Sequence, residues 1–102
     1  MTCKNRAPTH PGEMLSEEFL KPLGITQVGL ARRIDVPFQR VNQIVRGKRA
    51  MSPDTALRLA RLFGTTPGFW LGFQQRWDLH RALRSTQARQ ILRIKPVARR
   101  AS

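Results

Sequence analysis

Apolar side chains recur three and four positions apart in five segments of the chain, and groups of proline, glycine and threonine separate these segments. This spacing places the apolar side chains on one face of an α-helix, where they can pack together. Five such segments with short connections predict an all-α domain. Its helices are expected at about residues 12–20, 27–34, 37–46, 53–63 and 67–84.

Residues 26–46, TQVGLARRIDVPFQRVNQIVR, predict two short helices joined by a tight turn. Thr26 is a typical N-cap, and Asp35 is one of the few residue types that tolerates a left-handed turn conformation. Pro37 suits the first position of a helix but not its interior, because it has a fixed φ and no N–H. The apolar side of the pair consists of Leu30, Ala31, Ile34, Val36, Val41, Ile44 and Val45. With an amide-rich outer face on the second helix, the pair is typical of a DNA-binding helix-turn-helix.

The flanking helices have recognisable ends. Residues 21–24, Lys-Pro-Leu-Gly, are expected to stop the first helix, and Gly47 should lie just beyond the third. Ser52-Pro53 and Thr66-Pro67 each place an N-cap residue before a proline at the first helical position. The inward-facing residues of the first helix are expected to be Met14, Leu15, Phe19 and Leu20. Those of the fourth helix are expected to be Ala56, Leu57, Leu59, Ala60 and Phe63.

The helices form one expected domain, residues 10–84, between a flexible N-terminus, residues 1–9, and a basic C-terminal tail, residues 85–102. The sequence pattern of this tail fits either a short extended segment or a partly ordered tail. Cys3 is the single cysteine, so no intramolecular disulfide framework or metal cluster is expected. No apolar run approaches the roughly 18–20 residues of a membrane span, and no signal peptide follows Met1. We therefore expect a cytoplasmic protein that does not partner a membrane.

The strong excess of positive charge is the compositional feature that says most about function. The chain has 19 Lys and Arg residues against 6 Asp and Glu, a net charge of +13. Three of the six acids, Glu13, Glu17 and Glu18, lie in the first helix, which leaves the remaining surface almost entirely positive. Such an excess on a small domain indicates nucleic-acid binding. An acidic protein or a membrane surface is the alternative, and membrane binding would require a basic helix with a large exposed apolar face.

Base reading is expected from the first turns of the third helix, which should lie in the major groove. Asparagine and glutamine can each make two hydrogen bonds to an adenine edge, so Gln39, Asn42 and Gln43 are the expected base-reading residues. Phe38 could pack on a thymine methyl group, or it could have an ordinary packing role against the neighbouring helices.

Phosphate contacts are expected from the polar and basic residues around this helix: Gln27, Arg40, Arg46, Lys48 and Arg49. Gln27 could hold a phosphate together with the free backbone N–H groups at the start of the second helix, or it could be a plain first-turn residue. The basic residues would strengthen binding to every sequence and make it salt-dependent, although a charge cluster is often only a solvated face. Arg32 and Arg33 are further candidates.

The fifth helix carries more aromatic and leucine side chains than a small domain can bury. Phe69 and Trp70 are expected to belong partly to the core, whereas Phe73, Trp77 and Leu83 are expected at a two-fold dimer interface.

An enzyme would require a constellation of catalytic residues. Glu13 and Glu17 share a helix face and could in principle hold a metal for nuclease work, but we interpret them as partners of the helix dipole. His10 and His80 are isolated, and a lone histidine is more often a cap or surface residue. We expect no enzymatic activity, no metal and no cofactor.

The helix pair resembles the XRE family, the helix-turn-helix proteins of the Cro and phage-repressor type. The motifs HPGE at 10–13, GKR at 47–49, SPDTALRLA at 52–60 and FWL at 69–71 are together similar to the HigA-type antitoxins, over about residues 10–79. This resemblance implies a homodimer that binds a palindromic operator of its own operon and neutralises a HigB-type, ribosome-dependent, mRNA-cleaving toxin. It also implies a phage-repressor-like domain of five helices with a short C-terminal extension.

Three positions depart from the family pattern. Asp35 stands where a glycine is common in the turn, Gly29 lies inside the second helix, and Phe38 replaces an amide or hydroxyl residue. These departures concern operator preference rather than the fold. Because toxin binding follows from the resemblance alone, the alternative is a stand-alone XRE-family repressor without a toxin partner.

Overall fold

The computed structural model describes residues 7–98, and within this range the chain is all-α. The elements in order are α1 Pro11–Leu15, the π-helical turn η1 Ser16–Leu20, α2 Lys21–Leu23, α3 Gln27–Ile34, α4 Phe38–Val45, α5 Pro53–Phe63, α6 Pro67–Leu83 and α7 Ala88–Leu92. The first three form one continuous helical segment, so the five expected helices are confirmed and α7 is additional. Cys3, the rest of residues 1–6 and residues 99–102 lie outside the described range.

The first helical segment continues through Lys21, Pro22 and Leu23, and it ends only at Gly24, the last residue of the stretch that was expected to stop it. Pro22 has no N–H to donate, and its ring crowds the carbonyl group four residues back in an α-helix. The preceding π turn widens the helix there, since the N–H of Lys21 donates to the carbonyl of Ser16, five residues back. The predicted end at Leu20 was therefore wrong. Gly24, at φ 67°, ends the segment in the left-handed conformation.

The turn between α3 and α4 confirms the role expected for Asp35. Asp35 has φ 58°, and the N–H of Val36 donates to the carbonyl of Ala31 over 3.0 Å. Pro37 has φ −62° and ψ 145°, which is extended, so it is the N-cap of α4 and not its first helical residue as predicted. Thr26 caps α3 by accepting a hydrogen bond from the N–H of Gly29 over 2.9 Å. The turn therefore fixes how α4 is presented beside α3.

Trp70 lies at the centre of an aromatic cluster in the core and is fully buried. The rings of Phe19 and Phe69 lie 5.0 Å from it, and its Nε1–H donates to the hydroxyl of Thr65 over 2.8 Å. Leu57 was expected in the core but is 58% exposed, because Ala56, Leu59 and Ala60 define the inner face of α5. The buried apolar residues are Leu15, Leu20, Leu30, Ala31, Ile34, Val41, Ile44, Met51, Ala56, Leu59, Ala60 and Trp70.

Gly12 allows α1 to lie against the carboxyl end of α4. A Cβ atom at this position would lie 1.8 Å from the carbonyl oxygen of Ile44, which is far inside van der Waals contact. His10, the N-cap of α1, accepts a hydrogen bond from the N–H of Gly12 at its Nδ1 atom over 2.9 Å. The expectation that an isolated histidine is a cap is confirmed here. The His10-Pro11-Gly12 turn thus sets the distance between α1 and α4.

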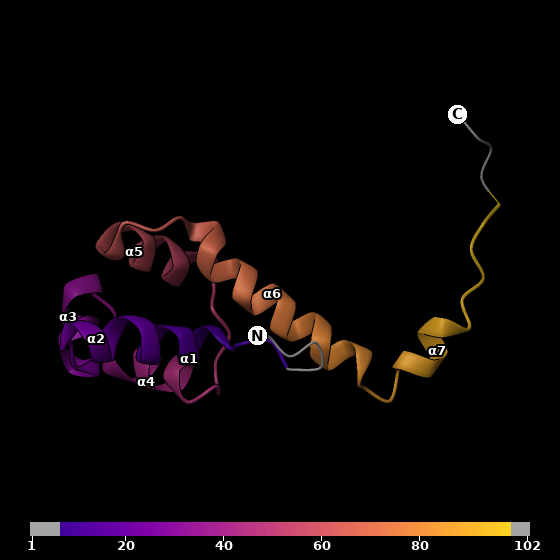
Figure 1. Ribbon diagram of the computed structural model, residues 1–102, viewed down its shortest axis with the longest axis horizontal. Coiled ribbons are helices and arrows are strands. Elements are labelled where there is room, and N and C mark those ends of the chain that lie inside the picture. Colours follow the sequence, from indigo (N-terminus) through magenta and orange to yellow (C-terminus); the bar gives the residue numbers. More distant parts are fainter. Residues whose placement is uncertain (1–6, 99–102) are drawn as a thin grey trace.

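Helix α6 continues beyond the rest of the domain (Figure 1). Its first turns pack against α5, and α1 packs against both α4 and α6. The carboxyl end of α6 and α7 extend away from the other helices, which gives the molecule extents of 53 × 30 × 29 Å. Residues 93–98 follow α7 without regular structure and are exposed. No helix within residues 7–98 is both long and apolar enough to cross a membrane.

Candidate DNA-reading surface

The polar side chains of helix α4 lie on its outer side, together with the aromatic ring of Phe38. Val41 and Ile44 are buried against the domain, whereas Gln39 is exposed and Phe38 is 44% exposed at the start of the helix. Asn42 and Gln43 are half-buried on the outer side. The four predicted base-reading residues therefore share one accessible face, as major-groove readout requires.

Asn42 and Gln27 connect the outer faces of α4 and α3. The Nδ2 group of Asn42 donates to Oε1 of Gln27 over 3.0 Å. Gln27 is the first residue of α3, beside the Thr26 cap. The hydrogen bond leaves the Nε2 group of Gln27 as a donor suited to a phosphate oxygen, and it fixes the position of Asn42 on α4.

Arg49 reaches back to α4 from the loop that follows it. Its Nε–H donates to Oε1 of Gln43 over 3.0 Å. The loop itself begins at Gly47, which has φ 74°, and the N–H of Lys48 donates to the carbonyl of Gln43 over 2.8 Å. Gly47 thus ends α4 as predicted, and the turn directs Arg49 towards Gln43.

Asp54 of α5 joins two arginine side chains at the edge of the reading surface. Nη1 of Arg40 lies 2.8 Å from Oδ2 of Asp54, and Nε of Arg58 lies 2.9 Å from the same oxygen. Arg58 also donates to the carbonyl oxygen of Ile34, at the end of α3, over 2.8 Å. The hydrogen bonds from Arg58 and then Arg40 lower the pKa of the Asp54 carboxyl. This network ties α3, α4 and α5 together and orients Arg40.

Sequence reasoning assigned no role to the Asp54–Arg58 pair in this network. Asp54 was interpreted only as an acid in the first turn of its helix, and Arg58 was not singled out. Their spacing of four residues is a usable signal for an ion pair on one helix face. The contacts to Arg40 and Ile34 join segments far apart in the sequence, and no local pattern indicates them.

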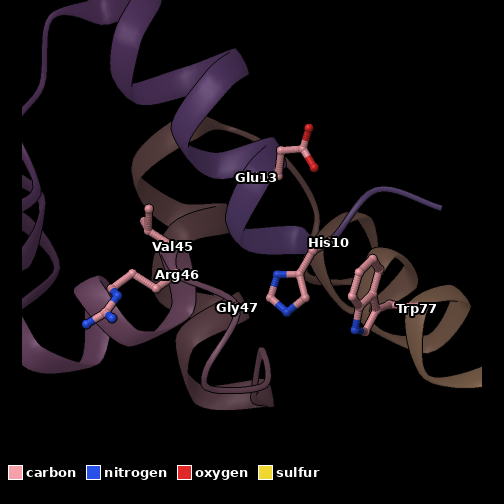
Figure 2. Close-up of a pocket in the computed structure, with 6 residues that line it drawn as sticks. All are labelled: His10, Glu13, Val45, Arg46, Gly47 and Trp77. Atoms are coloured by element: carbon pink, nitrogen blue, oxygen red, sulfur yellow. The ribbon is translucent and has the colours of Figure 1, made fainter. Parts of the chain in front are cut away.

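The remaining predicted phosphate-contacting residues, Arg46 and Lys48, are exposed at the carboxyl end of α4. Arg46 lines a shallow hollow with His10, Glu13, Val45, Gly47 and Trp77 (Figure 2). The His10 ring meets the Trp77 ring edge-on, with centroids 5.1 Å apart. Burial lowers the pKa of His10, and the nearby Asp78 and Glu13 carboxylates oppose this shift. Within residues 7–98 no three His, Cys, Asp or Glu side chains lie close enough together to hold a metal ion.

Comparison with known proteins places this surface in a family. A helix-turn-helix family model matches residues 17–70, which include α3, α4 and α5. Antitoxin HigA-1 of Vibrio cholerae is 42% identical over 79 residues, which cover 78% of this chain and 74% of the relative. The chain belongs to the HigA-type antitoxins of the XRE helix-turn-helix family.

Other proteins are similar to the chain at comparable identity. Virulence-associated protein I of Dichelobacter nodosus is 44% identical over 90 residues, which cover 87% of this chain and 83% of that protein. The solved structure of the Pseudomonas aeruginosa antitoxin HigA with the higBA promoter superposes with a TM-score of 0.83 at 40% identity. That match covers 89% of this chain and 99% of the other. The similarity to HigA proteins thus extends well beyond the helix-turn-helix and includes α6.

In this HigA-type chain, the residues expected at a dimer interface do not share one environment. Phe73 packs edge-on against Phe69 at 5.1 Å, and the guanidinium of Arg76 lies 4.9 Å above its ring. Trp77 contacts His10, so both aromatic residues are half-buried within the chain. Leu83 is 68% exposed, and Leu79, one turn earlier, is 60% exposed. On α6, the more exposed apolar surface therefore lies towards the carboxyl end of the helix.

Proposed function

We propose that this chain is a DNA-binding antitoxin that represses its own operon and neutralises a HigB-type mRNA-cleaving toxin. The observation that carries the proposal is the accessible amide face of α4, in a chain whose fold matches an antitoxin solved with its own promoter. The net charge of +13 supports the DNA-binding role, because Lys and Arg neutralise phosphates and release counterions. Toxin neutralisation rests on family membership.

The roles divide by position on the surface. Base reading is assigned to the outer residues of α4, which are Phe38, Gln39, Asn42 and Gln43. Phosphate contact is assigned to the surrounding donors, which are Gln27, Arg40, Arg46, Lys48 and Arg49. Asp54 holds the guanidinium of Arg40 in an ion pair and so directs it. In that orientation Arg40 would contact a phosphate. We assign the chain a binding role without enzymatic activity, a view supported by its similarity to an antitoxin and to a helix-turn-helix transcriptional regulator.

Truncating a base-reading residue should change sequence preference, whereas truncating a phosphate-contacting residue should not. Gln39→Ala is expected to cost about 1–3 kcal/mol on the operator and to relax base choice. Lys48→Ala is expected to weaken operator and random DNA equally and to lower the salt slope by about one. Fluorescence anisotropy titrations on both duplexes at three salt concentrations separate these outcomes. Equal losses on both duplexes for Gln39→Ala would remove Gln39 from the base-reading set.

We further propose a homodimer that places two α4 helices in successive major grooves, about 34 Å apart. The exposed leucines near the end of α6 support this assignment, with Phe73, Trp77 and Leu83 as the proposed interface. Leu83→Asp is expected to yield a monomer by light scattering at micromolar concentration, because it introduces a charge into an apolar contact. Leu57→Asp, on the exposed side of α5, is the matched control and should remain dimeric. A monomeric wild-type protein would contradict the two-fold arrangement.

The function as a whole is tested by co-expressing the chain with the product of the adjacent gene and by a gel shift on its own promoter. The proposal predicts a stable complex with that product, relief of its toxicity, and retention of the promoter fragment. Promoter binding without a complex would instead indicate a stand-alone repressor. Failure to retain the promoter would overturn the DNA-binding half of the proposal.

A further inference from the structure

The hydrogen bond between Arg49 and Gln43 fixes which end of the Gln43 amide faces Arg49. Arginine has five N–H donors and no acceptor, so the atom 3.0 Å from its Nε must be the carbonyl oxygen of the glutamine. The Nε2 group, with two hydrogens, then lies at the opposite end of the amide. In the Asn42–Gln27 pair both partners are amides, and exchanging O and N on both would preserve the hydrogen bond. Among the residues assigned to base reading, Gln43 is the one whose amide orientation is imposed by a partner that can only donate.

This orientation changes what Gln43 can recognise. A free glutamine contacts adenine through both ends, since its oxygen accepts from N6 and its NH₂ group donates to N7. When Arg49 occupies the oxygen, the side chain offers mainly donors, and the guanidinium adds further N–H groups beside it. On a major-groove edge, guanine presents two adjacent acceptors, N7 and O6, and no donor. The Gln43–Arg49 pair has several N–H donors and only one remaining acceptor lone pair on the Gln43 oxygen, so it matches guanine better than adenine.

We propose that Arg49 is a specificity-positioning residue that orients Gln43 towards a guanine in the operator. The inference rests on the proposed function, because it refines how the same α4 surface selects DNA. Arg49 is exposed in the loop after α4, and its backbone position is set by the turn at Gly47. Its role as a phosphate contact would be sequence-independent, so the two roles give different experimental signatures.

The first step of the test identifies the base pair that Gln43 contacts. Binding of wild-type protein and Gln43→Ala is measured on a panel of operator duplexes, each with one base pair replaced. The contacted pair is the one whose replacement weakens the wild type but no longer affects Gln43→Ala. We expect this pair to be G·C, with guanine on the contacted strand favoured over adenine by about tenfold in the wild type.

The second step measures the same guanine-to-adenine ratio in Arg49→Ala. With the oxygen of Gln43 released, bidentate contact with adenine becomes available, and the ratio should fall to about one or below. Lys48→Ala is the matched control because it removes one charge from the same exposed loop. Both variants should bind all duplexes more weakly, but only Arg49→Ala should alter the ratio. Thermal unfolding of each variant confirms that the domain is intact.

The outcomes are distinguishable. An adenine at the contacted pair in the wild type, or an unchanged ratio in Arg49→Ala, would overturn the role proposed for Arg49 and leave operator binding intact. Wild-type protein that does not discriminate its promoter from a scrambled duplex would overturn the proposed function, and this inference with it.

Discussion

Gly12→Ala is expected to destabilise the domain severely, by more than about 3 kcal/mol of unfolding free energy. The added Cβ would lie 1.8 Å from the carbonyl oxygen of Ile44 and 2.7 Å from its carbonyl carbon. Both atoms belong to backbone, so the clash is relieved only by separating α1 from α4. Overpacking a core typically costs about 1–3 kcal/mol, and a clash with fixed backbone should exceed the upper value. Operator binding should weaken as well, since Ile44 lies in the helix that carries the proposed base-reading residues and the clash would shift that helix.

Urea unfolding followed by circular dichroism measures this effect. Gly68→Ala is the matched control, because a Cβ there meets only the hydroxyl of Thr66 at 4.0 Å, in ordinary contact. The control should retain wild-type stability to within about 0.5 kcal/mol. A Gly12→Ala protein as stable as the control would show that α1 does not approach α4 as closely as described.

Trp70→Ala is expected to cost about 3–5 kcal/mol of unfolding free energy. Trp70 is fully buried among Phe19, Phe63 and Phe69, and its removal leaves a cavity between the N-terminal helical segment, α5 and α6. The hydroxyl of Thr65 would also lose its hydrogen-bond donor. Because domains of this size are stable by only about 5–15 kcal/mol, the loss consumes a large share of the total.

Trp70→Phe separates the contribution of aromatic packing from that of the hydrogen bond to Thr65. Phenylalanine keeps most of the aromatic packing but has no N–H for Thr65, so it should be clearly more stable than Trp70→Ala. Denaturant midpoints at constant m-value provide the comparison. A loss below about 1 kcal/mol for Trp70→Ala would contradict the central position of this ring in the core.

Helix caps were predictable from the sequence because they depend on neighbouring residues alone. Ser52, Thr66, Asp35 and Gly47 all adopt the roles expected from their side chains or their φ preferences. The end of the first helix was predicted too early, at Leu20, because a local rule for α-helices does not anticipate a π turn before Pro22. Leu57 was misplaced because the whole apolar run was interpreted as a buried helix face, whereas the domain packs against the side of α5 that carries Ala56 and Leu59.

The sequence was sufficient to predict which side chains lie on the outer face of α4, but not which hydrogen bonds and ion pairs they form. Helical periodicity separated Gln39, Asn42 and Gln43 from the buried Val41 and Ile44. Periodicity cannot show that Arg49 occupies the oxygen of Gln43, or that Asp54 holds Arg40 across the α4–α5 connection. These contacts depend on how separate segments meet, and they determine which donors and acceptors remain available to DNA.

The central claim is that the outer face of α4 reads the operator of this chain's own promoter. The most direct measurement is the ratio of dissociation constants for the promoter and for a scrambled duplex of equal length and composition, in about 0.15 M salt. Wild-type protein is expected to prefer the promoter by at least about a thousandfold, and Gln39→Ala is expected to reduce this ratio. Equal binding of the two duplexes would contradict the central claim, since attraction of the positive charge to phosphates would then explain all of the binding.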